Sequence, residues 1–249
     1  MFNNKEYFEV NREERHYGNL LISSIIYDDN FRKHFFELIN SKLRINDYLK
    51  GNFDIYSETA IFRDYWHDLG DQNKWNNELL IRRKKIIELF FNHFNIDLKI
   101  IEKYPIFWTG KINDSKLWSP GNWTKTNNLK ILKNIEIENS IENSNLCRIG
   151  WAFNAKPDLL IISNNNCIII ELKLESGVGS NDHGYNQIQT QQDIIDLIKV
   201  SIPYFENYTF KNIMIAKESE EYCISWTELV QYFNNDLVKK HFSNIIKKY

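Results

Sequence analysis

The most informative segment of the sequence is Pro157-Asp158-Leu-Leu-Ile-Ile-Ser163-Asn-Asn-Asn166-Cys-Ile-Ile-Ile-Glu171-Leu172-Lys173. It indicates two short apolar strands joined by an Asn-rich turn, because Asn tolerates the positive φ that tight hairpin turns require. A two-residue loop at Asn164 and Asn165, or a four-residue loop, gives the same register, in which Asp158 faces Glu171. A three-residue loop would place Asp158 opposite Leu172 instead.

The two opposed carboxylates predict a metal site. Side chains directly across a strand pair lie about 5 Å apart at Cβ, and like charges there destabilise the sheet. A hard divalent cation held by Asp158 and Glu171 would remove the repulsion. The alternative is an edge hairpin with one solvated face. The nearly continuous apolar run after Asp158 argues against it, because such a run is typical of a strand buried on both faces.

The second strand places a cation beside the acids. Strand side chains alternate between faces, so Lys173 and Ile169 share the face of Glu171. An ammonium there could position a water or a phosphate oxygen. The other face of the strand is wholly aliphatic and suits a core: Ile168, Ile170, Leu172 and Leu174.

Pro157-Asp158, twelve intervening residues and Glu171-Leu172-Lys173 resemble the motif of the PD-(D/E)XK nuclease superfamily, which has the restriction-endonuclease-like fold. The resemblance implies a Mg²⁺-dependent enzyme, with Mn²⁺ as a substitute, that hydrolyses phosphodiester bonds. It implies that Asp158, Glu171 and the Leu172 carbonyl are metal ligands and that Lys173 acts on the attacking water. DNA is the implied substrate, and a restriction or phage-defence endonuclease is the implied role.

The order of predicted elements extends this resemblance. We expect an α/β protein with a mixed sheet and an αβββαβ core at 75–249, preceded by a helical N-terminal region at 1–74. The expected elements are a helix at 75–94, a first strand within 96–109, an insertion at about 110–150, the two motif strands, a helix at 186–198, a strand at 210–216 and a helix pair at 226–249. The predicted order contains two consecutive strands that form a hairpin. This argues against Rossmann and TIM-barrel folds, in which strands and helices alternate along the chain.

Members of the resembled superfamily often add an acid from the helix before the first strand. Glu78 is the favoured candidate, with Glu88, Glu13 and Glu14 as alternatives. An ion pair between Glu78 and Arg82, four residues apart on one helix, is the competing structural explanation.

Other polar residues are candidates for contacts with nucleic acid. Gln187 and Gln191 share a helix face after the motif, where the resemblance implies approach to the metal site and the scissile phosphate, with Gln187 as a candidate catalytic residue and Gln191 as a nucleic-acid contact. A polar outer helix face is the alternative. Arg82 and Arg83 belong to a cationic run that could bind phosphates, or could be a solvated face. Lys111 lies in a segment that interleaves basic residues with Trp, as base-stacking grooves do.

Composition limits the function classes. The 249 residues are 43% hydrophobic and 14% aromatic, which suits a large core. The formal net charge of −2 means that nucleic acid must be bound by a local basic patch. Three distant cysteines without a C-x-x-C pair indicate neither a zinc knuckle nor a disulfide framework. We see no membrane-spanning run or signal peptide, and therefore expect a soluble, cytoplasmic protein.

The sequence thus predicts a metal-dependent nuclease that binds nucleic acid, either as a homodimer or with a partner protein. A catalytically inactive nucleic-acid-binding or protein-interaction subunit with a nuclease-like fold is the alternative.

Overall fold

The structure is a computed structural model that describes residues 14–45, 49, 52–109, 116–141, 144–174, 187–217 and 223–248. Within these ranges the chain is a mixed α/β protein. Its contacts divide it into two compact units. The first comprises Met1–Thr59, Pro157–Asn186 and Tyr208–Tyr249, and the second comprises Ala60–Lys156 and Gln187–Asn207. The boundary predicted after residue 74 falls inside the second unit.

The first unit contains a five-stranded mixed sheet in the order β1-β4-β5-β6-β7. The neighbours β1, β4 and β5 are antiparallel, whereas β5, β6 and β7 run parallel. The strands are β1 (Asp54–Ser57), β4 (Leu159–Ser163), β5 (Asn166–Leu172), β6 (Thr209–Ala216) and β7 (Cys223–Ser225). The two strands of the motif therefore lie in the interior of the sheet.

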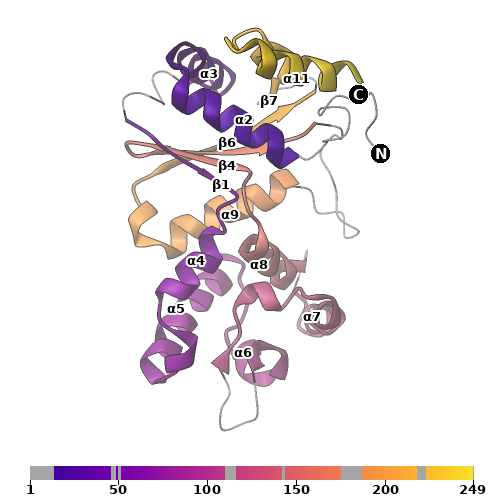
Figure 1. The fold of residues 1–249 in the computed structure, drawn as a ribbon. Helices are drawn as coiled ribbons and strands as arrows, with labels where there is room; N and C mark the ends of the chain where they lie inside the picture. The colour runs from indigo at the N-terminus through magenta and orange to yellow at the C-terminus, as the bar shows by residue number, and fades with distance from the viewer. Residues whose placement is uncertain are drawn as a thin grey trace. The chain divides into compact units, whose positions relative to one another are not determined.

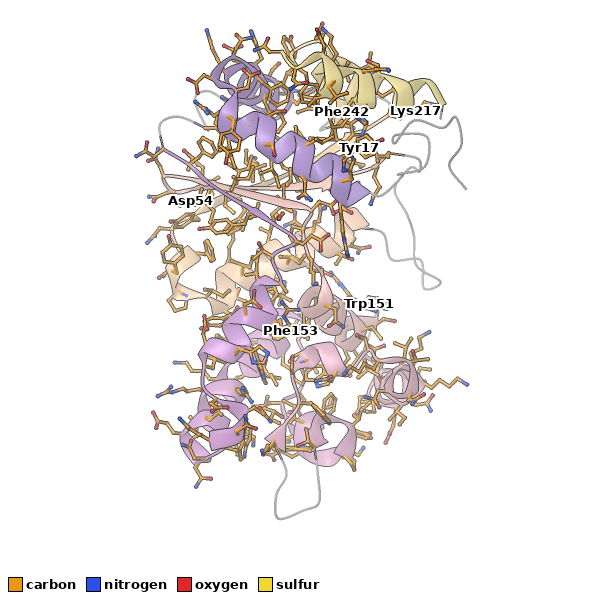
Figure 2. All side chains as sticks on the ribbon, in the orientation of Figure 1. Tyr17, Asp54, Trp151, Phe153, Lys217 and Phe242 are labelled. Atoms are coloured by element: carbon orange, nitrogen blue, oxygen red, sulfur yellow. The ribbon has the colours of Figure 1, made fainter. Side chains whose placement is uncertain are left out.

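Helices α2 (Glu14–Tyr27), α3 (Asp29–Lys42), α10 (Trp226–Val230) and α11 (Asp236–Lys248) belong to the same unit. Figure 1 shows α2, α3 and α11 on one side of the sheet. Asp28 separates α2 from α3 and caps α3 by accepting a hydrogen bond from the Phe31 N–H at 2.9 Å. Tyr17 of α2 and Phe242 of α11 meet edge to face, with ring centroids 5.1 Å apart (Figure 2).

The predicted hairpin register is confirmed. The β4–β5 ladder pairs Ser163 with Asn166 and Leu159 with Ile170. Asn164 in the turn has a φ of 52°, which Asn tolerates better than most residues. The aliphatic face of β5 is part of the core, and Ile169 on the opposite face is also fully buried, so the strand is buried on both faces.

The first strand of the sheet is not where the sequence placed it. Lys99–Lys103 forms helix α6, and Pro105–Phe107 forms a 3₁₀ turn. The strand found within 96–109 is β2 (Trp108–Thr109), and it pairs with β3 (Lys116–Leu117) in a separate two-stranded sheet. The buried residues Ile96, Ile100 and Ile101 have helical spacing, which the strand prediction overlooked. The first strand of the five-stranded sheet is instead β1, which pairs with the edge of β4 that faces away from β5.

The second unit is mainly helical. Rings of Phe62, Phe90 and Phe153 pack together in its core, with centroids 5.3–5.7 Å apart, and Figure 2 labels Phe153. Its helices are α4 (Ile61–Asp68), α5 (Asn77–His93), α6, α7 (Thr126–Glu138), α8 (Asn145–Asn154) and α9 (Gln187–Ser201).

Other predicted elements are found. The helices predicted at 75–94 and 186–198 are α5 and α9, the strand at 210–216 is β6, and the C-terminal helix pair is α10 and α11. The three cysteines are free and buried. No helix within the described ranges is long and apolar enough to cross a membrane.

Candidate functional site

Asp158 and Glu171 lie at adjacent positions where the motif hairpin ends. Leu159 and Ile170 form the last pair of the ladder, and Asp158 and Glu171 are the next residues on the two strands. The Asp158 carboxylate accepts a hydrogen bond from the Leu172 N–H at 2.7 Å. This contact continues the bonding between the strands by one step. Asp158 therefore holds the end of the hairpin together as well as supplying a charge.

Glu171 and Lys173 form an ion pair, with Lys173 Nζ 2.9 Å from a Glu171 carboxylate oxygen. The side chains are only 14% and 8% exposed, so the pair is largely desolvated. The pairing agrees with the prediction that both side chains share one face of β5. Charges removed from water are tolerated when they are paired in this way.

The backbone of Lys173 is fixed on two sides. Its N–H donates to the Ile215 carbonyl of β6 at 2.8 Å, and its carbonyl accepts from the Trp226 indole N–H of α10 at 2.8 Å. Trp226 is itself buried. These contacts hold the ammonium at a defined position, which a positioning or catalytic role requires.

A third acid that was not among the predicted site residues, Glu58, directly follows β1. The Glu58 N–H donates to the Asp158 carbonyl at 3.2 Å, so the residue lies beside Asp158 at the same end of the sheet. Its carboxylate forms an ion pair with Arg15 of α2. Only the pairing of β1 with β4 reveals Glu58, because the β1 sequence is too short and polar to be recognised as a strand.

A pocket of about 220 Å³ opens beside these acids. Its walls include Arg15, Asn19, Glu58, Asp158 and Leu172. A Cβ atom on Gly18 would lie 3.1 Å from Leu172 Cδ1, so the glycine allows α2 to lie close to β5 here. The motif thus borders a small cavity that has both charged and apolar walls.

The donors fit Mg²⁺ better than other common metals. Asp158 and Glu171 offer hard carboxylate oxygens, and in the part of the chain that the structure describes no three His, Cys, Asp or Glu residues form a metal-binding group. Zinc sites and all-protein calcium cages need more protein ligands. Mg²⁺ is typically held by one or two carboxylates together with waters and substrate phosphates.

The remaining predicted site residues either lie in the second unit or fall outside the residues that the structure describes. Glu78 is 71% exposed on α5 and pairs with Arg82, the structural alternative that the sequence left open. Gln191 is buried on α9. Gln187 begins that helix, but its side chain is outside the described part, as is that of Glu14. Lys111 and Glu13 are outside the described residues altogether.

Glu78 and Glu88 do not precede the first strand of the sheet. Both belong to α5, which follows β1 in the chain. The helices before β1 are α2 and α3. The reason for predicting an acid from α5 therefore no longer holds.

The structure corrects the prediction that Arg83 binds nucleic acid. Arg83 is fully buried, and its guanidinium donates to Gln72 Oε1 and to the carbonyls of Trp66 and Gly70. It lies 4.9 Å from the Trp66 ring and 5.4 Å from the Trp75 ring. Burial lowers its pKa to about 10. The side chain stabilises the interior of the second unit and cannot reach a phosphate.

Replacing Arg83 with Met is expected to lower the free energy of unfolding by about 2–4 kcal/mol, because the buried carbonyl oxygens lose their donors. Replacing the neighbouring Arg82 with Gln should change it by less than about 0.5 kcal/mol, because that side chain is 54% exposed. Urea denaturation of both variants measures the contrast. Equal losses from the two substitutions would show that Arg83 has no special structural role.

No protein-family model matches the chain, and no significant similarity was found to a curated protein or to a solved structure.

Proposed function

We propose that the chain is a metal-dependent nuclease of the PD-(D/E)XK type. The main support for the proposal is the hairpin register, in which Asp158 and Glu171 are neighbours on adjacent strands. Lys173 lies at the same end of the sheet and pairs with Glu171. The chain order supports it: helices α2 and α3 precede β1, and β1, β4, β5, α9 and β6 then follow in the order of the αβββαβ pattern once residues 60–156 are taken as an insertion after β1. The core would then begin near α2 rather than at residue 75.

The residues of the site have separate roles in this proposal. Asp158 and Glu171 would hold Mg²⁺, together with the Leu172 carbonyl. When bound, such an ion acts as a Lewis acid on phosphate oxygens. Lys173 would orient the attacking water and offset negative charge that develops on the phosphate. The ammonium lies 2.9 Å from a Glu171 carboxylate oxygen, which supports a role for Lys173 beside that proposed metal ligand.

Glu58 and Arg15 extend the site beyond the motif. The Arg15 side chain is 71% exposed, so a phosphate can approach it without displacing core residues. Exposed ion pairs contribute little stability, and Arg15 can therefore exchange Glu58 for a phosphate at low cost. We assign Arg15 to substrate contact and Glu58 to holding Arg15 at the edge of the pocket.

DNA is the proposed substrate, in a restriction or phage-defence role, with a homodimer or a partner protein as the working form. The alternative is a catalytically inactive nucleic-acid-binding or protein-interaction subunit. One observation favours that alternative: Asp158 and Glu171 both make contacts that also stabilise the hairpin without any metal.

Cleavage of supercoiled plasmid and of labelled oligonucleotides tests the proposal. Wild-type protein should cut in Mg²⁺ and in Mn²⁺ and should be inactive in EDTA. If neither metal supports cleavage of DNA or RNA, the inactive-subunit alternative replaces the nuclease.

A further inference from the structure

A groove with cationic and apolar walls lies in the second unit. It has a volume of about 390 Å³ and is formed by α4, α5, the C-terminal end of α9 and the 3₁₀ turn Pro203–Phe205. All of these elements belong to one unit. The carboxylate site is formed by residues of the first unit.

Three cationic side chains line this groove: Arg82, Lys85 and Lys199. Among the described residues of its wall, Glu206 is the acid that opposes them. Arg82 is held at the rim because it donates to the Leu69 carbonyl at 3.2 Å. Its exposed ion pair with Glu78 is of the weak kind that a phosphate can replace.

Two members of the cationic run 82–85 line the groove. Its four members point in different directions around α5. Arg83 is buried, and Lys84 pairs with Glu102 at 3.0 Å. Arg82 and Lys85, three residues apart, are left on the groove side of the helix. The run therefore contributes two cations to this surface instead of four.

Helix α9 ends at the groove, where its carbonyl oxygens would normally repel an anion. Three of these oxygens already accept hydrogen bonds. The Leu197 carbonyl accepts from Ser201 Oγ at 2.6 Å, and the Ile198 carbonyl accepts from the Ile202 N–H at 2.9 Å. The Ser201 carbonyl accepts from the Tyr65 hydroxyl at 3.1 Å. These bonds reduce the repulsion that a phosphate would meet there.

The floor of the groove is apolar and includes Leu69, Ile86 and Ile202. Pro203 and the ring of Tyr65 also line it. Cations at a rim, with apolar and aromatic surface between them, are typical of sites where the backbone follows the charges and unpaired bases pack on the rings. A duplex would keep its bases away from such a floor.

We infer that this groove binds a single-stranded segment of nucleic acid through its phosphodiester backbone, with Arg82, Lys85 and Lys199 as the phosphate contacts. The choice of nucleic acid over another polyanion rests on the proposed nuclease function. The binding measurement below does not depend on cleavage.

The test compares two triple variants. The groove variant is Arg82→Gln/Lys85→Gln/Lys199→Gln. The control removes three exposed cations elsewhere in the second unit: Lys99→Gln/Lys125→Gln/Lys130→Gln. Both have the same net charge, so a difference between them reports position rather than total charge. Urea denaturation verifies that both remain folded.

Fluorescence anisotropy in EDTA measures binding of a single-stranded oligonucleotide of about 20 nucleotides, between about 50 and 200 mM salt. Each lost phosphate contact should reduce the slope of log K against log salt by about 0.7, so the groove variant should lose about 2 units. The control should keep the wild-type slope. A hairpin duplex of the same sequence should bind more weakly than the single strand.

Three results would overturn the inference: a wild-type slope in the groove variant, equal losses in both triple variants, or competition by polyglutamate as effective as that by unlabelled oligonucleotide. A wild-type protein that binds through the groove but cleaves in no metal would overturn the nuclease proposal and leave the groove assignment standing.

Discussion

Replacing Asp158 with Asn is expected to lower metal-dependent cleavage by about 100-fold or more while the protein stays folded. The substitution removes one negative charge from the proposed cation site. The Asn side-chain oxygen can still accept the hydrogen bond that the Leu172 N–H donates at 2.7 Å in the wild type. The variant therefore separates the charge of Asp158 from its structural contact. Initial rates of oligonucleotide cleavage in Mg²⁺ measure the effect.

Asp158→Ala is the matched control, because it removes both the charge and the acceptor. It should lose cleavage to the same degree and also lose about 1–3 kcal/mol of unfolding free energy, since a backbone N–H at the end of the hairpin loses its partner. If Asp158→Asn cleaves at the wild-type rate, the carboxylate only closes the end of the hairpin, and the metal-site assignment is wrong.

Replacing Lys173 with Met should lower the free energy of unfolding by about 3–5 kcal/mol. Methionine keeps most of the aliphatic volume, but Glu171 remains largely buried without the ammonium 2.9 Å away. The double variant Glu171→Gln/Lys173→Met removes both charges and should recover much of the loss, because a neutral pair needs no compensation. A double-mutant cycle by urea denaturation gives the coupling between the two residues.

Activity separates the catalytic from the structural role of this pair. Neither Lys173→Met nor the stabilised double variant should cleave, because restoring stability does not restore the ammonium or the carboxylate. The Arg82–Glu78 pair, which is exposed, supplies a control cycle with coupling of about 0.5 kcal/mol or less. If the double variant cleaves at the wild-type rate, Glu171 and Lys173 have only a structural role as a buried ion pair.

The hairpin could be predicted because its determinants are local. The Asn-rich turn restricts the hairpin to two registers, and the period-two pattern assigns Glu171 and Lys173 to one face. The two long amphipathic helices α5 and α9 could also be predicted, because their apolar residues recur at helical intervals. These features depend on neighbours within one segment, and a single sequence contains that information.

The first strand could not be predicted, because its identity depends on tertiary pairing. β1 has four residues, of which only Ile55 is appreciably shielded from solvent. It becomes a strand by pairing with β4 across an insertion of about a hundred residues. Glu58 and its contact with the Asp158 carbonyl could not be found without that pairing.

The burial of Arg83 could have been predicted from the spacing of apolar residues on α5. Leu79, Arg83 and Ile87 recur at four-residue intervals, so the arginine falls on the buried stripe of α5. The charge of its neighbours suggested a surface instead. The rings that enclose Arg83 come from Trp66 and Trp75, which precede the helix, and their approach depends on how α4 packs.

A crystal soaked in Mn²⁺ can show whether Asp158 and Glu171 bind a metal, because the anomalous scattering of manganese locates the ion. We expect an ion bound by carboxylate oxygens of Asp158 and Glu171 at about 2 Å, and its loss in Asp158→Asn crystals. If the soaked wild-type crystal holds no Mn²⁺ between these two residues, or if the ion persists there unchanged in Asp158→Asn, the metal-site account is contradicted.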